Sequence, residues 1–375
     1  MKVLLLSLLL TFLLSLLTTS RCSDGESMIM ETLLKQWDGE DIILRYARPS
    51  GVWIIIAIHS SRLGLPSGGT RMKQYPDLAA AVRDAMNLSR GMTFKFAVAG
   101  MARGGGKAVI NLPAGFDPAQ RPHLLRRYGA LVRQLGGFYE TGPDVGTAPE
   151  DMDVIAETGS PHVYGRTPAN GGSGNTGYPT AIGVFSAIEA ACQHLYHSPS
   201  LAGRRVLVQG TGSVGGSLIS LLQEAGAEIL FTDVDETAVH HYRDELGLPF
   251  VPAEAVYDTP CDIFSPCALG GILNEMTIPR LQCWAVVGGA NNQLAETADA
   301  GHLHQQGILY APDYAVNIGG AMAVLSIESE GLSPAQAYEK VRGVKDTLLR
   351  IFQTAASENV SPDVAAQRLA EARLA

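Results

Sequence analysis

Apolar residues recur along this chain in two patterns, one typical of strands and one typical of helices. Residues 40–48 and 51–59 are rich in β-branched and apolar side chains, which predicts two strands joined by a turn. A glycine-rich loop is expected next, and residues 77–90 then carry apolar side chains at helical spacing. Strand and helix patterns alternate further along the chain, through Ile278. This alternation predicts an α/β fold with largely parallel sheets.

The same patterns predict the remaining elements. Expected strands lie at residues 107–111, 137–140, 206–208, 228–231 and 284–287, and expected helices at 31–37, 118–136, 149–157 and 180–194. Residues 104–106 are expected to form a turn. Lys95 is expected to follow the helix 77–90, near the start of a strand.

A stretch rich in glycine, asparagine and serine, YGRTPANGGSGNT at residues 164–176, divides the chain. This composition is typical of a hinge between two domains. We expect residues 28–165 to form a first α/β domain and residues 177–332 a second. Residues 333–375 are expected to be helical and to pack back on the first domain.

Residues 1–27 differ from the rest of the chain. A short basic start precedes an uncharged apolar run, and small residues follow, as in a secretory signal. The run is short for a membrane span. Two interpretations stay open. Either the protein is exported or membrane-associated, or the true start is Met28 or Met30 and the protein is cytoplasmic.

Composition narrows the class of protein. The net charge is −9, from 28 basic and 37 acidic residues, without a basic cluster, which argues against nucleic acid as a partner. We expect no membrane association for the chain that follows residue 27. The five cysteines form no disulfide framework and have no zinc-ligand spacing. We therefore expect no metal site, and buried thiols at Cys261 and Cys267.

A glycine fingerprint opens the second region. The apolar run 206–208 leads into Gly210-x-Gly212-x-x-Gly215, a helical pattern follows, and a second strand ends near Asp233. Strand, glycine turn, helix, strand and acid together predict a dinucleotide-binding unit. The first glycine makes the tight turn, the second lets the backbone approach the pyrophosphate, and the third lets helix and strand pack closely. A carboxylate at Asp233 accepts hydrogen bonds from ribose hydroxyls and repels a 2′-phosphate, which favours NAD over NADP. The alternative is a tight turn that binds nothing.

Two lysines interrupt a run of apolar and small residues in GMTFKFAVAGMARGGGKAVINLP, at Lys95 and Lys107. Burial beside another cation lowers the pKa of a lysine, so that it serves as a neutral base near neutral pH. One lysine could then hold a substrate carboxylate while the other does acid–base work. The alternative is a pair of lysines that extend to solvent from a strand–loop–helix unit.

Seven segments of the chain resemble the glutamate/leucine/phenylalanine/valine dehydrogenases, and most of all their leucine dehydrogenase branch. They are GGTRM (68–72), GMTFKFAVAGMARGGGKAVI (91–110), TGPDVGT (141–147), VQGTGSVG (208–215), PCALGG (266–271), GGANNQL (288–294) and PDYAVNIGG (312–320). The resemblance runs from about Met30 to the C-terminus. It implies a substrate-binding domain followed by a Rossmann domain with a cleft between them, and a homo-oligomer.

The resemblance implies reversible oxidation of an L-amino acid by NAD and water to a 2-oxo acid and ammonia. Carried over by position, Lys95 binds the substrate carboxylate, Lys107 activates the water that attacks the imine, and Asp144 transfers protons to and from the amino nitrogen. These tasks need an acceptor carboxylate and a lysine of lowered pKa. For Asp144 alone, the alternative is a turn aspartate.

Further positions match the family around substrate and cofactor. Gly64 and Met92 match positions near the substrate, and Asn292 matches a loop near substrate and nicotinamide, although it could equally be part of a plain turn. Thr180 either donates to the carboxamide or caps the start of its helix. The remaining cofactor positions are those of the fingerprint, which are Gly210, Gly212, Ser213, Val214, Gly215 and Asp233.

The identity of the substrate side chain depends on the charge at the pocket floor. Glutamate-specific relatives supply a lysine before a Gly-Gly pair, whereas the candidates here are Leu63, Leu65 and Ser67, all uncharged. We therefore expect an apolar substrate, such as leucine, valine or isoleucine, with residues 315–317 near the pocket wall. An apolar pocket separates such substrates by only about 1–3 kcal/mol per methylene.

Three residues depart from the leucine branch, and other functions stay open. Arg62 is expected to face solvent rather than the substrate, and Phe94 and Phe96 place two rings beside Lys95. An aromatic amino acid dehydrogenase for phenylalanine or tryptophan is therefore the alternative. A non-catalytic NAD-binding protein and an exported protein with a changed role are the other two hypotheses.

Overall fold

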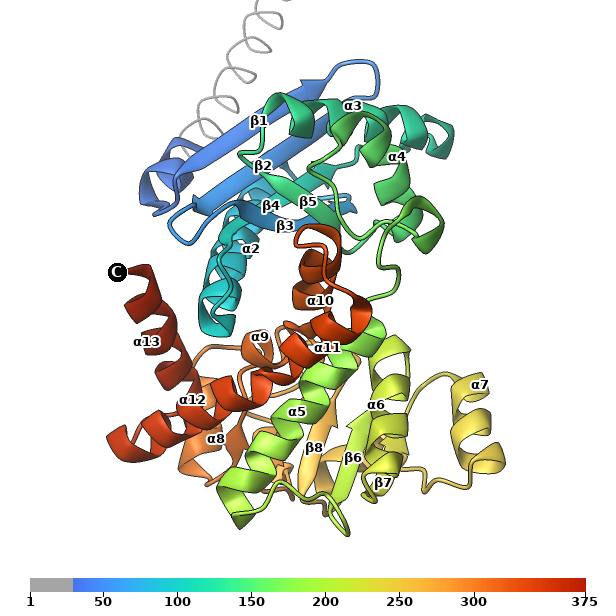
Figure 1. The fold of residues 1–375 in the computed structure, drawn as a ribbon, viewed down its shortest axis with the longest axis vertical. Helices are drawn as coiled ribbons and strands as arrows, with labels where there is room; N and C mark the ends of the chain where they lie inside the picture. The colour runs from blue at the N-terminus through green and yellow to red at the C-terminus, as the bar shows by residue number, and fades with distance from the viewer. Residues whose placement is uncertain (1–29) are drawn as a thin grey trace, which may run out of the picture.

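The computed structural model describes residues 30–375, which form two five-stranded sheets with helices around them (Figure 1). The leader predicted over residues 1–27 and the start at Met28 lie outside the described residues. Among residues 30–375, no helix has the combined length and hydrophobicity that a membrane crossing requires.

The first sheet has the strand order β1-β2-β4-β3-β5. Its strands are β1 (Asp41–Ala47), β2 (Val52–Ser60), β3 (Pro66–Lys73), β4 (Gly104–Asn111) and β5 (Glu140–Pro143). Strand β2 is antiparallel to β1 and β4, whereas β3 is parallel to β4 and β5. Successive side chains of β2 point to opposite faces, so Ile54, Ile56 and Ile58 enter one core and Ile55 and Ala57 another. Helices therefore cover both faces.

Three long helices belong to this sheet. They are α2 (Leu78–Ala99), α3 (Arg121–Gln134) and α4 (Pro149–Gly159), with a short 3-10 turn η1 (Pro118–Gln120) before α3. Residues 30–36 are also helical. Helix α2 packs on β2 and β4, while α3 and α4 pack on each other over the opposite face.

The course of the chain between residues 66 and 111 corrects three predictions. The expected glycine-rich loop is strand β3, the expected turn at 104–106 belongs to β4, and the helix expected to end at residue 90 continues to Ala99, so that Lys95 lies on it. The reason is close packing of α2 on β4. A Cβ on Gly105 would come within 2.3 Å of Thr93 N, so only glycine allows the helix to lie this close to the strand.

The second sheet is parallel throughout, with the order β10-β9-β8-β6-β7. Its strands are β6 (Arg205–Gln209), β7 (Glu228–Thr232), β8 (Ile263–Pro266), β9 (Ala285–Val286) and β10 (Leu309–Tyr310). Val206 and Val208 enter one core and Leu207 the other, so both faces are buried, as in doubly wound sheets. The predicted strand–turn–helix–strand unit over residues 206–233 is thereby confirmed.

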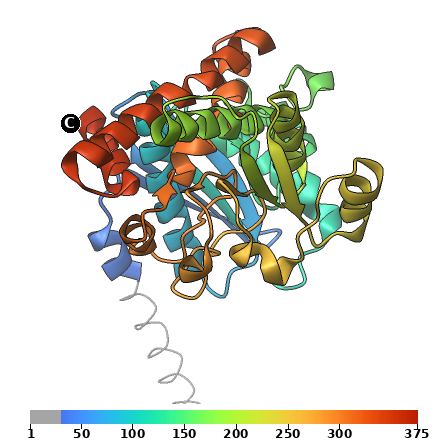
Figure 2. The same cartoon turned by 90° about the horizontal axis from the view of Figure 1, so that it is seen from below.

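Helices and short turns accompany this sheet from residue 168 to the C-terminus. They are α5 (Gly177–Tyr196), α6 (Ser213–Glu224), α7 (Glu236–Val239), α8 (Asp299–Gln305), α9 (Asp313–Val316), α10 (Gly319–Glu328), α11 (Pro334–Arg342), α12 (Val344–Glu358) and α13 (Pro362–Leu374), with turns η2 (Pro168–Asn170), η3 (His240–Glu245), η4 (Ala253–Asp258) and η5 (Ile278–Arg280). Figure 2 shows α12 beside α5 on one face of the sheet.

The C-terminal helix α13 returns to helix α2 of the first sheet, whereas α11 packs mainly on α10 and α5 and α12 mainly on α5, so only the last part of residues 333–375 packs back as expected. Where α13 packs on α2, Arg373 Nη1 donates to the carbonyls of Ala97 and Val98. Arg62 Nη1 in turn donates to Leu374 O at 2.5 Å. Arg62 is exposed and bonded to the end of α13, so it faces away from the cleft described below, in agreement with the sequence-based expectation.

Candidate active site

A cleft of about 980 Å³ lies between the two sheets. The first sheet and α2 contribute one wall, and α5, α6, α9, α10 and the loop after β9 contribute the other. Of the predicted site residues, the cleft brings together Met92, Lys95, Lys107, Asp144, Thr180, Val214 and Asn292. Gly64 is not among its lining residues. Gly64 instead lies against the backbone of Ala102, with a φ of 137°, which only glycine adopts readily.

Lys107 and Asp144 are in direct contact at the floor of this cleft. Lys107 projects from β4 and is only 6% exposed, and Asp144 directly follows β5. The Lys107 Nζ lies 3.1 Å from Asp144 Oδ2, and Arg71 Nε from β3 donates to the same oxygen at 3.0 Å. The parallel pairing of β3 with both β4 and β5 brings these three side chains together on the face of the sheet that α2 covers.

Burial and charge shift the pKa of both groups. Burial lowers the pKa of Lys107, although the Asp144 carboxylate opposes this effect. Burial alone would raise the pKa of Asp144, but the Lys107 ammonium and the Arg71 guanidinium hold it below its ordinary value. The pair therefore combines an ionised carboxylate with a lysine that gives up its proton more readily than a lysine in water.

Lys95 reaches the same cleft from the last turns of α2. Its Nζ donates to Asn317 Oδ1 at 2.5 Å, and Asn317 Nδ2 donates to Asn291 Oδ1 at 2.8 Å. Burial lowers the pKa of Lys95 to about 8, with Asp313 acting in the opposite direction and Lys107 in the same one. Lys95 thus lies where an anionic group entering the cleft would meet two lysines.

The loop after β9 is held to α9 by a half-buried carboxylate. Asp313 accepts hydrogen bonds from the backbone N–H groups of Asn292 and Tyr314. Asn292 has a φ of 53°, a left-handed conformation that asparagine tolerates better than most residues. Burial raises the pKa of Asp313, while Lys95 opposes that shift. Asn292 is exposed at the cleft, on the wall that belongs to the second sheet.

The glycine fingerprint has the shape that a dinucleotide requires. A Cβ on Gly215 would lie 1.9 Å from Gly210 O, so helix α6 can start this close to β6 only with glycine there. A Cβ on Gly212 would meet nothing within 4 Å, which leaves its backbone open to a ligand at the start of α6. Ser213 is exposed and Val214 lines the cleft. These residues fit a pyrophosphate at the helix N-terminus.

Asp233 directly follows β7, beside this glycine turn. Its Oδ2 accepts hydrogen bonds from Thr211 N at 2.6 Å and Thr211 Oγ1 at 2.7 Å, and its Oδ1 accepts one from Asp235 N. Burial opposes ionisation, but these donors lower the pKa of Asp233 below its ordinary value. Asp233 therefore presents a negative charge at the edge of the fingerprint.

Thr180 lies one turn inside helix α5 rather than at its start. The helix begins at Gly177, and Thr180 Oγ1 donates to Thr176 O at 2.8 Å. The capping alternative for Thr180 is therefore wrong, because Thr176 occupies the N-cap position. Its hydroxyl lies at the cleft, close to Gly320.

Part of the cleft wall is apolar. Leu88, Met92, Phe94, Ala321 and Val324 line it. Ser67, the position before Gly68-Gly69, is completely buried and donates to Leu65 O and Glu140 Oε2. Phe96 enters the hydrophobic core and does not line the cleft, so only one of the two predicted rings is near a substrate.

Sequence reasoning placed Asn317 near the pocket wall but missed other polar residues of the cleft, among them Arg71, Asp84 and Asp313. Arg71 and Asp313 stand in segments that carry the family resemblance, and Asp84 stands in none. Nothing in the sequence shows that Asp84, on the expected helix, faces Arg71. Only the packing of α2 over the sheet brings Asp84 within 3.1 Å of that arginine.

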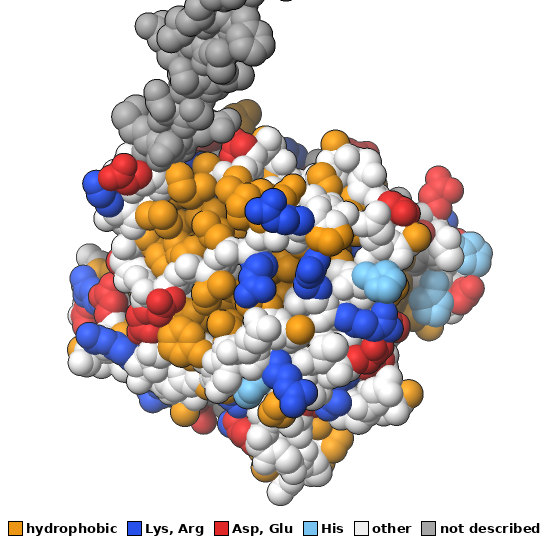
Figure 3. All heavy atoms as spheres, turned by 90° about the horizontal axis from the view of Figure 1, so that it is seen from above, with side chains coloured by type: hydrophobic (Ala, Val, Ile, Leu, Met, Phe, Trp, Pro, Cys, Tyr) orange, Lys and Arg blue, Asp and Glu red, His pale blue; other side chains and the backbone are white. Residues whose placement is uncertain are grey.

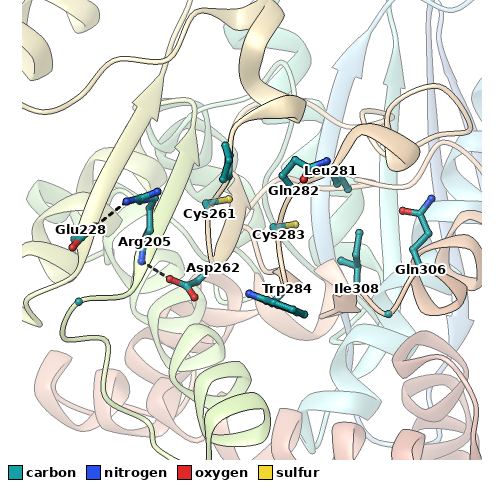
Figure 4. A pocket seen from close by; sticks show the side chains of 13 residues that line it. Arg205, Glu228, Cys261, Asp262, Leu281, Gln282, Cys283, Trp284, Gln306 and Ile308 are labelled. Carbon is teal, nitrogen blue, oxygen red and sulfur yellow. Dashed lines mark hydrogen bonds and ion pairs between the residues drawn. The ribbon is translucent and has the colours of Figure 1, made fainter.

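A second cavity, of about 610 Å³, opens at the opposite edge of the second sheet (Figure 4). It lies at the amino ends of the strands, near Arg205, Asp262 and the exposed ring of Trp284. Ligands of open α/β sheets bind at the carboxyl ends instead. Cys261 and Cys283 lie side by side here, next to the starts of neighbouring strands. Cys261 and Cys267, which were expected to be buried thiols, are half-buried.

Comparison with known proteins finds matches over most of the chain. A model of the Glu/Leu/Phe/Val dehydrogenase dimerisation domain matches residues 50–160, and one of the glutamate/leucine/phenylalanine/valine dehydrogenases matches residues 171–246 and 230–370. Leucine dehydrogenase of Thermoactinomyces intermedius is 40% identical, covering 91% of this chain and 92% of the relative. Valine dehydrogenase of Streptomyces virginiae is 42% identical, covering 94% and 99%.

One solved structure matches closely enough to compare the fold in detail. The L-tryptophan dehydrogenase of Nostoc punctiforme superimposes with a TM-score of 0.80 and is 38% identical. The match covers 92% of this chain and 98% of that one. The similarity therefore extends over both sheets and the cleft between them.

Proposed function

The chain belongs to the Glu/Leu/Phe/Val dehydrogenase family, and from that premise we propose that it oxidises an apolar L-amino acid with NAD and water to a 2-oxo acid, ammonia and NADH. The single observation that carries the proposal is the floor of the cleft. There Lys107 touches Asp144, Lys95 lies in the same cleft, and an apolar wall stands beside them.

Each of these residues has a distinct role in the proposed reaction. The Lys95 ammonium binds the substrate carboxylate, which places Cα over the floor of the cleft. Asp144 accepts a proton from the substrate ammonium, because the nitrogen lone pair must be free before hydride can leave Cα. NAD, when bound, supplies the acceptor for that hydride. Lys107, once its own proton has passed to solvent, takes a proton from the water that attacks the resulting substrate iminium. Asp144 then returns its proton to the amino nitrogen, and ammonia leaves as the carbonyl forms.

The closed surroundings strengthen these effects. Lys107 is almost completely buried, and a charge in such a site acts more strongly than the same charge in water. The lowered pKa of Lys107 matches the task of a general base. Proton abstraction and water activation are thus assigned to two neighbouring groups with opposite charges in the resting state.

The preference for NAD over NADP rests on Asp233. Its carboxylate already accepts hydrogen bonds from Thr211 and Asp235, which holds it ionised beside the glycine turn. A ribose hydroxyl can donate to an ionised carboxylate, whereas a 2′-phosphate is repelled by it.

A branched aliphatic side chain fits the substrate wall best. Ala321, Val324, Leu88 and Met92 offer apolar contacts, and no lysine stands at Ser67 to pair with a second carboxylate. We propose leucine, valine and isoleucine as substrates. The second candidate is an aromatic amino acid, favoured by Phe94 at the cleft and by the similarity to an L-tryptophan dehydrogenase.

We also propose that the protein is a homo-oligomer joined through strand β1. Within residues 30–375 this strand pairs with β2 alone and so is an edge of the first sheet. It exposes Leu44 and Tyr46, and Figure 3 shows apolar side chains gathered on this end of the molecule. An exposed apolar edge strand is a template for pairing with a second copy.

The proposed reaction is tested by its products. The purified chain is supplied with L-leucine and NAD at alkaline pH, and NADH, ammonia and the 2-oxo acid are each quantified. We expect the three in equal amounts, and little NADPH when NADP replaces NAD. NADH without ammonia would contradict oxidative deamination, and equal use of NADP would contradict the assignment of Asp233.

A further inference from the structure

Arg71 lies between two carboxylates on the face of the first sheet that α2 covers. Its Nε donates to Asp144 Oδ2 at 3.0 Å, and its Nη1 lies 3.1 Å from Asp84 Oδ2. The Arg71 side chain is 17% exposed, so the ion pairs are largely shielded from solvent. Arg71 therefore joins α2, which carries Asp84 and Lys95, to the residue that follows β5.

The two cations around Asp144 approach the same oxygen. Lys107 Nζ and Arg71 Nε both contact Oδ2, at 3.1 and 3.0 Å. Across residues 30–375, no protein group donates a hydrogen bond to Asp144 Oδ1, and Asp144 lines the cleft. The backbone of Asp144 is held as well, because its N–H donates to Thr147 Oγ1 at 2.9 Å. One carboxylate oxygen is thus fixed by protein and the other is left for a ligand.

Arg71 is itself held in place from its far side. Asp84 Oδ2 also accepts a hydrogen bond from the Tyr75 hydroxyl, so that Asp84 is bonded to both residues. Close packing fixes Asp144 in turn, because a Cβ on Gly69 would come within 2.9 Å of Asp144 Cβ. Side-chain contacts therefore run without a break from Tyr75 through Asp84 and Arg71 to Asp144, which lines the cleft.

We propose that Arg71 is a positioning residue for the deamination proposed above. Arg71 keeps Asp144 ionised and directs the Oδ1 atom of Asp144 toward the substrate amine. It does so during the part of the cycle in which Lys107 has lost its proton. The inference rests on the proposed function and assigns to Arg71 a role that Lys107 cannot fill. An arginine stays charged throughout the accessible pH range, whereas a buried lysine does not.

The surrounding charges support this division of roles. Six charged or titratable groups act on or beside Asp144, namely Arg71 from β3, Tyr75 after it, Asp84 and Lys95 from α2, Lys107 from β4 and Tyr164. Burial alone would lower the pKa of Arg71, but Asp144 and Asp84 raise it above its ordinary value. When Lys107 is neutral, Arg71 is the remaining cation in contact with Asp144 among the described residues.

The test compares Arg71→Gln with Arg71→Lys in the full chain, over a pH series of kcat and KM for L-leucine. Arg71→Gln removes the charge, and we expect kcat to fall about tenfold to a hundredfold while KM changes little. The pKa of Asp144 should rise, so the loss of kcat on the acid side should move to higher pH. Arg71→Lys keeps a charge without the planar fork, and should return the acid side toward its wild-type position with kcat only partly restored.

Two further variants make the result interpretable. Arg126 on α3 forms an exposed ion pair with Glu157 on α4, away from the cleft. Arg126→Gln removes this pair and should leave kcat and its pH profile unchanged. If Arg71→Gln does not fold, Asp84→Asn loosens Arg71 from its far side and should give a smaller change in the same direction.

The inference is overturned if Arg71→Gln, or Asp84→Asn in its place, has the kcat and acid-side profile of the wild type. It is also overturned if Arg71→Lys shows the same acid-side shift as Arg71→Gln, since charge would then not be the cause. Failure of the proposed function is distinguishable, because the wild-type chain itself would then form no NADH with L-leucine or any other amino acid.

Discussion

Lys95 and Lys107 share one cleft, yet their contacts give them different chemistry. Lys107 touches a carboxylate and is almost completely buried, whereas Lys95 is bonded to the neutral amide of Asn317. An ammonium that meets only a neutral partner is available to an incoming carboxylate. An ammonium beside a carboxylate is better suited to passing protons. The two lysines are therefore expected to respond differently to substitution.

Truncation of each lysine should separate binding from chemistry. Lys107→Ala should lower kcat by about two orders of magnitude or more, with the Kd of NAD nearly unchanged, because general base catalysis contributes on this scale. Lys95→Ala should mainly raise the KM for the amino acid. Steady-state kinetics measure kcat and KM, and titration with NAD measures its Kd. Wild-type turnover in Lys107→Ala would remove its catalytic role.

Lys95 should also affect stability in the absence of substrate. Its pKa in the folded chain is about 8, below the 10.5 of an ordinary lysine, so the unfolded chain binds this proton more tightly. The stability of the folded chain should therefore rise between these two pH values. At pH 7 Lys95→Met should raise the free energy of unfolding by about 1 kcal/mol or more. Urea unfolding at pH 7 and pH 10 tests this, and an equal gain at both pH values would contradict it.

The sequence predicts the chemical groups of the cleft better than their partners. Lys95, Lys107 and Asp144 stand out because charged residues interrupt apolar or glycine-rich segments. Arg71 and Asp84 do not stand out, since a charged residue on a strand edge or helix is ordinary. Gly64 was expected beside the substrate, but its left-handed backbone serves a turn against Ala102. Pairings of this kind depend on tertiary packing, which periodicity does not encode.

Helix α2 is the element on which the cleft depends most. It carries Lys95 and Asp84, and its length was underestimated because Gly91 and the β-branched Thr93 lower helix propensity near its middle. Tertiary packing outweighs that loss, because Gly105 of β4 allows the helix to rest on the strand backbone at Ser89 and Thr93. The predicted strand β2 and fingerprint helix α6, whose patterns are local and strong, agree closely with the structure.

The end of α2 is held by the C-terminal helix. Arg373 donates to the carbonyls of Ala97 and Val98, and a cation at a helix C-terminus is favourable. Arg373→Ala should lower the free energy of unfolding by about 1–2 kcal/mol and raise the KM for the amino acid, because Lys95 lies one turn away. Urea unfolding and steady-state kinetics measure these changes.

Arg368→Ala is the matched control for this prediction. Arg368 lies on the same helix α13 but pairs with Glu358 at the exposed surface. Exposed pairs contribute little, so this variant should stay within about 0.5 kcal/mol of the wild type. Equal unfolding midpoints for the two variants would show that Arg373 does not hold α2.

At the scale of the whole molecule, two covered sheets enclose one cleft, and a short linker joins them. Glu328, at the end of α10, accepts hydrogen bonds from Gly165 N and from the backbone and hydroxyl of Ser173. We propose that residues 164–176 are the hinge between two domains and that Glu328 fixes its position. The sequence predicts the linker from its composition, but not the side chain that anchors it.

The proposed assembly is also a property of the whole molecule. Leu44 is 39% exposed on the edge strand β1, so Leu44→Glu should place charge in the proposed interface and lower the molar mass measured by light scattering. Met276→Glu is the control, because Met276 is 74% exposed beside the second sheet. An unchanged mass for Leu44→Glu would place the interface elsewhere.

The most direct test of the central claim is kcat/KM with NAD for leucine, valine, isoleucine, phenylalanine, tryptophan and glutamate. The account predicts the highest value for a branched-chain amino acid, with glutamate lower by about tenfold or more, because the cleft offers an apolar wall and no lysine at Ser67. A highest value for tryptophan or phenylalanine would select the second candidate and assign the specificity to Phe94. Preference for glutamate, or no turnover with NAD bound, would contradict the account.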